Sequence, residues 1–214
     1  MENNIKQTTK LHFDKIAEDY NNSSDGRFVK CMYEEIINRV SQIQPETILD
    51  LGCGNGNVLA ALAKCTNSKL FGLDLSENMI SEAKKRLNDD VELKIGDSEN
   101  LPYEDNKFDV IICNASFHHY IHPKKVLNEI KRVLKPNGIL ILGDPTFPCN
   151  WLLKIINKFL PMSNSGDYKL YNQKMISSLF NECGFSPYNF KKLNCKSFII
   201  NAKALKLIFL KIRQ

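Results

Sequence analysis

The chain has 214 residues, of which 43% are hydrophobic and 25% are charged, and its formal net charge is +5. This length suits one sizeable core and is too short for two comfortable domains. The lysines are spread along the chain without a long basic block, so the charge does not identify a nucleic-acid-binding protein. No apolar run approaches the ~20 residues that a membrane-spanning helix needs.

The seven cysteines are scattered, and no two of them form a C-x-x-C pair. The polar start "MENNIKQTTK" lacks the apolar stretch of a secretory signal. An odd number of cysteines without such a signal predicts reduced thiols in a cytoplasmic protein, and zinc binding is not expected.

Short β-rich runs alternate with helical patterns along most of the chain. Ser76 is a predicted helix N-cap, and Lys94 indicates an edge position for the strand that contains it. A turn is expected at "KPNG", where a helical stripe ends. The predicted strands of this part comprise residues 47–51, 69–75, 91–97, 108–114 and 139–144.

The chain after residue 171 has a different pattern. Asn172 and Gly184 are the predicted N-cap and C-terminal stop of one helix, and two further strands follow as a hairpin. Strands separated by helix-length segments predict right-handed βαβ units. We therefore predict an α/β fold, a Rossmann-like three-layer αβα sandwich with a seven-stranded, mostly parallel sheet and an antiparallel C-terminal hairpin.

Three glycines, Gly52, Gly54 and Gly56, directly follow the first predicted strand. A tight turn needs only one glycine, so this density predicts a ligand that the backbone approaches closely. The spacing is G-x-G-x-G, with Asn57 at the third position of the dinucleotide fingerprint G-x-G-x-x-G. Asp50 precedes the turn, and a carboxylate there disfavours a pyrophosphate. It favours a ligand with positive charge, such as the sulfonium and ammonium groups of S-adenosylmethionine.

Four stretches, in this order and spacing, resemble the motifs of class I S-adenosylmethionine-dependent methyltransferases. They are "ILDLGCGNGN", "LFGLDLSENMISEAKKRL", "VELKIGDSENLPYEDNKFDVIICNASFHHY" and "VLNEIKRVLKPNGILIL". Together they are similar to the small-molecule branch that includes the ubiquinone and menaquinone biosynthesis methyltransferases. The segment "FDKIAEDYN" resembles the F-D-x-x-A-x-x-Y segment of that branch, so the similarity covers residues 12–144.

Asp74 ends the second predicted strand, 18 positions after Gly56. This is near the distance at which an acid receives a ribose, so we expect Asp74 to accept hydrogen bonds from both ribose hydroxyls. The resemblance implies the other contacts with the cofactor. They are Asp97 and Ser98 at the adenine edge, Leu75 and Met79 on the adenine faces, Gly52, Cys53, Gly54 and Asn55 beside the methionine portion, the Asn114 carbonyl at the ammonium, and Tyr20 over the methionine end.

The stretch "FHHYIH" (117–122) holds three of the four histidines. His119 is the candidate general base, since an imidazole titrates near neutral pH. Methyl transfer from a sulfonium can also rely on proximity and alignment, so a base is not obligatory. No carboxylate at a matching spacing accompanies these histidines, and we predict no metal site.

We predict an enzyme that transfers a methyl group from S-adenosylmethionine to an oxygen, nitrogen or carbon of a small acceptor, with S-adenosylhomocysteine as product. The alternatives are a tRNA-modifying methyltransferase, which no clustered arginine stripe supports, and a non-catalytic S-adenosylmethionine-binding protein. The single domain is expected to have four parts. They are a helical N-terminal cap (1–35), a cofactor-binding core (45–144), a substrate-side insertion (145–171) with a short helix near Trp151 and Phe159, and a C-terminal helix and hairpin (172–204).

Overall fold

One seven-stranded sheet organises the chain in a computed structural model, which describes residues 2–194 and 196–205. The strands lie in the spatial order β3-β2-β1-β4-β5-β7-β6. Neighbouring strands from β3 to β5 are parallel, whereas β7 pairs antiparallel with both β5 and β6. The predicted sheet is confirmed. Its strands are β1 Thr47–Leu51, β2 Lys69–Asp74, β3 Glu92–Ile95, β4 Phe108–Asn114, β5 Leu134–Pro145, β6 Phe185–Asn194 and β7 Ser197–Ala204.

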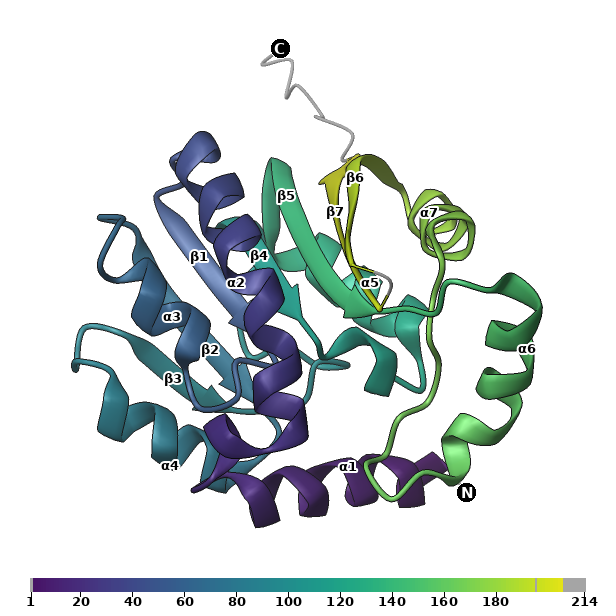
Figure 1. The fold of residues 1–214 in the computed structure, drawn as a ribbon. Coiled ribbons are helices and arrows are strands. Elements are labelled where there is room, and N and C mark those ends of the chain that lie inside the picture. The colour runs from purple at the N-terminus through teal and green to yellow at the C-terminus, as the bar shows by residue number, and fades with distance from the viewer. Residues whose placement is uncertain (1, 195, 206–214) are drawn as a thin grey trace.

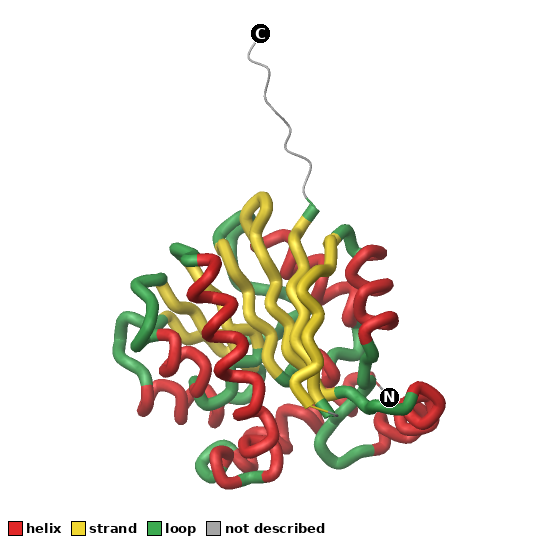
Figure 2. Tube along the Cα trace, turned by 45° about the horizontal axis from the view of Figure 1, so that its top comes forward, coloured by secondary structure: helices red, strands yellow, loops and turns green. Residues whose placement is uncertain are grey.

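Helices cover both faces of this sheet, which gives the three layers seen in Figures 1 and 2. Successive residues of β1 point to opposite faces, so Ile48 packs with one set of helices and Leu49 with the other. The first set is α2 (Ser24–Ile43), α3 (Asn57–Leu62) and α4 (Glu77–Arg86), and the second is α5 (Pro123–Val133) and α7 (Gln173–Glu182).

The predicted helix ends are confirmed by their hydrogen bonds. Ser76 Oγ accepts from Met79 N at 3.1 Å, and Asn172 Oδ1 accepts from Met175 N at 2.9 Å. Gly184 follows α7 with a φ of 76°, a conformation that suits glycine. These caps fix where α4 and α7 begin, and hence where the loops from β2 and from the 145–171 segment end.

The N-terminal helical region is divided differently from the expected cap of residues 1–35. Helix α1 (Glu2–Ile16) and the short 3-10 helix η1 (Tyr20–Asn22) lie across the carboxyl-terminal edge of the sheet (Figure 1). Helix α2 instead runs on to Ile43 and packs its buried Val29, Met32 and Ile36 against a sheet face. The segment before α2 is therefore the part that lies over the strand ends.

Two further segments differ from, or extend, the sequence-based expectation. Strand β5 begins at Leu134 rather than at residue 139, with Asn137 at a φ of 66° and a register shift against β4, so the expected turn at "KPNG" lies inside an irregular strand. The insertion holds α6 (Asn150–Phe159) and the 3-10 helix η3 (Leu160–Met162), and η2 (Phe117–His119) follows β4.

The cysteines that the structure describes are free thiols. None of the helices in the described ranges combines the length and the apolar character required to cross a lipid bilayer. Cys195 and the segment after Leu205 lie outside the described residues.

Candidate functional site

The carboxyl ends of β1 to β4 and the helix α1 surround a cavity of about 770 Å³, called here the first cavity. Loops at this edge of an open α/β sheet are the usual place for a ligand. The cavity brings together nine of the side chains or backbone positions predicted from separate motifs. They are Tyr20, Gly52, Gly54, Asp74, Leu75, Met79, Asp97, Ser98 and His119.

Gly52 and Gly54 hold the backbone close to this cavity. Both have left-handed conformations, with φ of 74° and 51°. A Cβ atom on Gly52 would lie 2.2 Å from Ser116 Oγ, so a side chain there would clash. A Cβ atom on Gly54 would have Met79 Sδ, at 4.0 Å, as its nearest neighbour, and would therefore occupy open space in the cavity. These glycines leave room for a ligand against the main chain.

Asp74 ends β2 with both carboxylate oxygens held by backbone N–H groups. Gly54 N donates to Oδ2 at 2.8 Å, and Ser76 N donates to Oδ1 at 2.9 Å. Burial raises the pKa of Asp74, and these N–H groups act in the opposite direction. Each carboxylate oxygen has a second lone pair. The carboxylate can therefore accept two further hydrogen bonds from a ligand.

Asp50 lies in β1 below the glycine turn and is 1% exposed. Its Oδ2 atom has no hydrogen-bond partner among the described residues. Burial, and then repulsion by Asp74, raise the pKa of Asp50 to about 7. A buried carboxyl group without a partner is costly, and a nearby positive charge would reduce that cost.

Helix α1 contributes charged contacts to the rim of the first cavity. Lys6 Nζ lies 2.8 Å from Asp97 Oδ2 and 2.9 Å from Glu99 Oε1. Burial alone would raise the pKa of Asp97, but the Lys6 hydrogen bond and the Glu99 N–H outweigh it and lower the pKa. Ser76 Oγ donates to Asp14 Oδ1 at 2.6 Å, which ties α1 to the start of α4.

Three of the predicted cofactor-binding residues do not line the first cavity. Cys53 is buried in the core, where its Sγ atom lies 2.9 Å from the position of a Cβ atom on Gly72. Asn55 Nδ2 donates to Asn21 Oδ1 at 3.2 Å. Asn114 ends β4, and its Oδ1 atom is buried without a hydrogen-bond partner in the described part of the chain. The contacts predicted for their main-chain groups stay predictions.

A second cavity, of about 650 Å³, adjoins the first. Both are lined by Phe13, Tyr20, Ala115 and His119, so these residues lie where the two meet. The Phe13 ring meets the His119 ring edge to face at a centroid distance of 5.3 Å. The remaining walls of the second cavity are Asp25, Phe28, Val29, His118, Pro145, Ser165 and Asp167.

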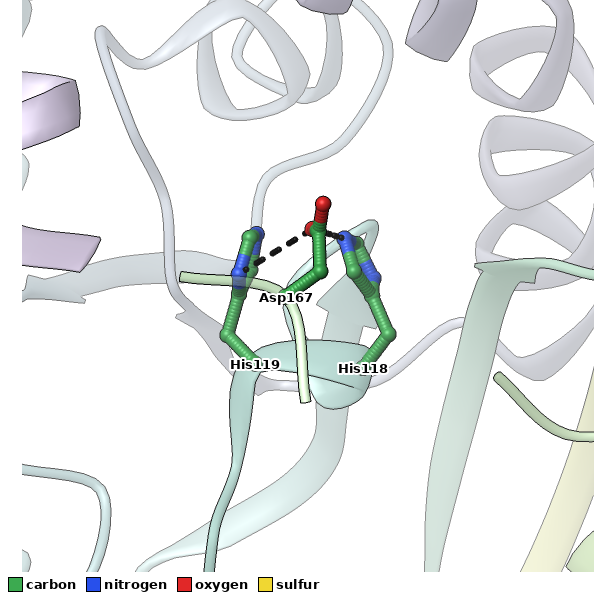
Figure 3. Close-up of side chains that lie close together, drawn as sticks. All are labelled: His118, His119 and Asp167. Atoms are coloured by element: carbon green, nitrogen blue, oxygen red, sulfur yellow. Dashed lines mark ion pairs between the residues drawn. The ribbon is translucent and has the colours of Figure 1, made fainter. Parts of the chain in front are cut away.

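His118, His119 and Asp167 form a compact cluster in the lining of the second cavity, with the Asp167 carboxylate between the two rings (Figure 3). Asp167 Oδ1 lies 3.3 Å from His118 Nε2 and 3.5 Å from His119 Nδ1. On its other side, His118 Nδ1 lies 2.8 Å from Oδ1 of the fully buried Asp144. The cluster joins the 3-10 helix η2, strand β5 and the insertion.

The pKa values of the two histidines in this cluster are shifted in opposite directions. Burial disfavours the charged form of His118, but Asp144 and Asp167 prevail and raise its pKa to about 10. Burial, followed by the charge of His118, lowers the pKa of His119 to about 3. His119 is therefore neutral at physiological pH. No sequence spacing pointed to a carboxylate beside these histidines, and it is the insertion that folds back and brings Asp167 to them.

A family described as methyltransferase domain matches residues 44–200 of the chain, which is more than half of its length. The chain belongs to this methyltransferase family. The resemblance deduced from the motifs is thereby confirmed, and so is the predicted enzyme class, an S-adenosylmethionine-dependent methyltransferase.

The methyltransferase is similar to two proteins named demethylmenaquinone methyltransferase. It is 36% identical over 189 residues to that of Thermotoga maritima, covering 80% of this chain and 82% of the relative. It is 33% identical over 171 residues to that of Lactobacillus johnsonii, covering 68% of this chain and 70% of the relative. A chain from the complex between the Haloferax volcanii Trm112 methyltransferase activator and the putative methyltransferase matches with a TM-score of 0.79 at 19% identity, over 93% of this chain and 98% of that chain. At that identity the match shows the fold alone.

Sequence motifs missed several residues of the methyltransferase site. Lys6 and Thr9 of α1 line the first cavity, and so do Ser116 and Tyr120 beyond β4. The Ser116 and Tyr120 hydroxyl groups lie 2.8 Å apart. Only the closeness of Ser116 and Tyr120 to the histidine stretch could have indicated them, and α1 offered no signal of this kind.

Two aromatic residues of the insertion lie away from both cavities. Trp151 and Phe159 in α6 are 65% and 59% exposed. Neither residue lines the first or the second cavity. The insertion instead contributes to the methyltransferase site through Pro145, Ser165 and Asp167.

Proposed function

We propose that this methyltransferase binds S-adenosylmethionine in the first cavity and a small acceptor in the second, and that the methyl group is transferred where the two cavities meet. The observation that carries the proposal is the buried Asp50, whose Oδ2 atom has no partner among the described residues, beside a glycine turn that leaves open space at Gly54. Burial of a carboxyl group at this place favours a positively charged ligand over a pyrophosphate.

The lysines that line the first cavity also favour a positively charged ligand over a pyrophosphate. Lys6 is paired with Asp97 and Glu99, and Lys10 Nζ lies 2.7 Å from Asp14 Oδ2. A phosphate would have to compete with these carboxylates for the lysines. The residues present thus fit a sulfonium ligand better than a dinucleotide.

S-adenosylmethionine supplies an activated methyl group on a positively charged sulfur atom when it is bound. In the proposal, Asp74 accepts hydrogen bonds from the ribose, Asp97 and Ser98 recognise the adenine, and Met79 packs on its face. Phe13 and Tyr20 close the site from the N-terminal segment and exclude water. Excluding water and holding the acceptor in line contribute to the rate without a proton acceptor.

His119 is proposed to contact the acceptor rather than to remove a full proton from it. A general base works best with a pKa near the working pH. The pKa of His119 is lowered to about 3, so its neutral ring is a weak proton acceptor. The ring nevertheless lies at the junction of the cavities, next to Phe13.

The acceptor is proposed to have a flat, apolar body and an oxygen atom at one end. Phe13, Phe28 and Val29 give the second cavity apolar walls, whereas His118 and Asp167 make one end polar. The relatives named demethylmenaquinone methyltransferase support such an acceptor. A cytoplasmic location, predicted from the cysteines, is part of the same proposal. No observation favours the tRNA-modifying or the non-catalytic alternative.

Thermal unfolding tests the cofactor. At about 100 times its dissociation constant a ligand stabilises the native state by about 2.7 kcal/mol, which raises the midpoint by about 5–10 °C for a chain of this size. We expect this shift with S-adenosylmethionine and with S-adenosylhomocysteine, and none with NAD. A shift with NAD alone would refute the proposal.

Release of S-adenosylhomocysteine tests the acceptor. The panel should contain reduced naphthoquinone analogues, other hydroxylated aromatic compounds, aliphatic amines and bulk tRNA. We expect turnover with the oxygen-bearing aromatic compounds. Turnover with tRNA alone would favour the tRNA-modifying enzyme, and cofactor binding without any turnover would favour the binding protein.

A further inference from the structure

The cluster at the polar end of the second cavity has the donor set of a metal site. His118, His119 and Asp167 each offer one ligand atom, and these three atoms lie within 4.8 Å of one another. Two imidazole nitrogens and one carboxylate oxygen suit divalent transition-metal ions. Mg²⁺ and Ca²⁺ prefer oxygen ligands throughout, so the two histidines disfavour them.

Two of the three distances within the cluster are close to those between ligands that share an ion. Two ligand atoms at about 2.1 Å from one ion, in tetrahedral arrangement, lie about 3.4 Å apart. The distances from Asp167 Oδ1 to His118 Nε2 and His119 Nδ1 are 3.3 Å and 3.5 Å. A charge-assisted N–H···O hydrogen bond would be shorter, at about 2.7–2.9 Å.

Asp144 provides the support that metal-binding histidines usually have. Its Oδ1 atom lies 2.8 Å from His118 Nδ1, and the carboxylate is fully buried. Without an ion His118 carries a proton on both nitrogens, and an ion would have to displace the Nε2 proton, on the side next to Asp167, while Asp144 keeps the proton on Nδ1. The same carboxylate–histidine pairing orients the ligands of many metal centres.

A backbone oxygen lies beside the same atoms. The Gly166 carbonyl oxygen is 3.2 Å from His119 Nδ1 and accepts a hydrogen bond from Thr9 Oγ1 at 3.1 Å. Thr9 belongs to α1, so this contact links the cluster to the helix over the first cavity. Since a carbonyl oxygen only accepts, His119 Nδ1 carries the proton in this contact and would have to lose it to bind an ion.

We propose that His118, His119 and Asp167 bind one divalent transition-metal ion, with Asp144 orienting His118. The ion would face the second cavity, where an oxygen atom of the acceptor could complete its coordination. This inference goes beyond the proposed function, because binding of the ion does not depend on S-adenosylmethionine.

Cobalt binding tests the proposal directly, since Co²⁺ bound by nitrogen and oxygen ligands gives visible absorption bands. The full chain is stripped with a chelator and titrated with Co²⁺ and then with Zn²⁺. Cys31, Cys65, Cys149 and Cys195 are replaced by serine to exclude binding by these thiols. We expect one ion per chain, visible bands with Co²⁺, and displacement of Co²⁺ by Zn²⁺.

Matched variants locate the ion. His119→Gln and Asp167→Asn should each weaken binding at least about tenfold, and Asp144→Asn about 10–100-fold, as for other residues that support a ligand. His122→Gln replaces a histidine of the same stretch outside the cluster and should bind as the parent protein does. Circular dichroism confirms the fold of each variant.

Two outcomes would overturn the proposal. One is a folded parent protein that binds well below one Co²⁺ per chain. The other is unchanged affinity in both His119→Gln and Asp167→Asn. Calorimetry of S-adenosylmethionine binding in the presence of the chelator separates the two proposals, because a protein that binds the cofactor but no ion refutes only the metal site.

Discussion

The walls of the first and second cavities differ in how much of their geometry is local. Around the first cavity, short stretches that follow successive parallel strands fix much of their own geometry, as when Gly54 N and Ser76 N hold Asp74. Helix α1 adds the ion pair between Lys6 and Asp97. Around the second cavity, distant segments meet through side chains, as when Asp167 reaches His118, and through the backbone, as when Tyr168 N donates to His118 O at 2.8 Å. The first cavity therefore depends mainly on the sheet and its loops, whereas the second depends on the path of the insertion.

The most direct test of the glycine turn at the first cavity is the variant Gly54→Val. The new side chain would fill the open space at Gly54 and should weaken S-adenosylmethionine binding by at least about 100-fold, or 2.7 kcal/mol. The left-handed backbone at this position also costs about 1–3 kcal/mol of stability for a non-glycine residue. Calorimetry and denaturant unfolding measure the two effects.

Gly184→Val is the matched control for Gly54→Val. Gly184 has a similar φ of 76°, and a Cβ atom there would meet the flexible end of Lys131 rather than a cavity. This variant should lose comparable stability and keep its affinity. Unchanged cofactor affinity in Gly54→Val would show that the first cavity is not the cofactor site.

Removal of residues 2–22 tests whether the N-terminal segment belongs to the site rather than to the core. Turnover should fall about 100-fold, since the segment supplies Phe13 and Tyr20 where the cavities meet. Stability should also fall, because Ala17 is buried and Tyr20 packs against the core, whereas the partly exposed ion pairs of α1 contribute little. Normal turnover in the truncated chain would contradict the role of this segment, and loss of the folded state would place it in the core.

Asp74→Asn probes a single polar contact of the first cavity. It should weaken S-adenosylmethionine binding by about 1.5–3 kcal/mol, the value of a hydrogen bond to a charged group, or about 10- to 150-fold. Asp89→Asn makes the same chemical change at an exposed position and should have no effect. Equal affinities of the two variants would remove Asp74 from the ribose site.

Asp50→Asn should produce an effect that depends on pH. The pKa of Asp50 in the folded chain is raised to about 7 from an ordinary 3.8. Between these values the folded state keeps a proton that the unfolded state has lost, so the free energy of unfolding falls as pH rises toward 7 and stays lowered above it.

The variant lacks this titration, so its stability relative to the parent should rise by about 2–3 kcal/mol from pH 5 to pH 8. Its affinity for a positively charged cofactor should be lower at pH 8, because the carboxylate is gone. Denaturant unfolding and calorimetry at both pH values measure these changes. Parallel stability profiles of variant and parent would contradict the raised pKa.

The parts that sequence could predict are those encoded by neighbouring residues. Ser76 and Asn172 were recognised as helix caps because a capping side chain lies within three residues of the N–H that it accepts from. The glycine turn and Asp74 were recognised because parallel strands deliver their ends to one edge of the sheet.

Long-range contacts escaped the same reasoning. Lys6 and Asp97 are 91 positions apart, and nothing near either residue indicates the other. Asp167 reaches the histidines only through the path of an irregular insertion, so no spacing rule could include it. Cys53 and Asn55 were predicted to contact the cofactor only because they belong to the glycine motif. The Cys53 side chain is buried in the core, and that of Asn55 points toward Asn21.

The ion pairs of Lys6 have a consequence for the catalytic cycle. Lys6 and Asp97 are 34% and 38% exposed, so dissolved salt can screen the attraction between them. If α1 must lift before S-adenosylhomocysteine leaves, moderate salt will speed product release, while the chemical step within the closed site changes little. The enzyme would then turn over faster at higher ionic strength whenever release limits the rate, and a burst of product in the first turnover would become weaker.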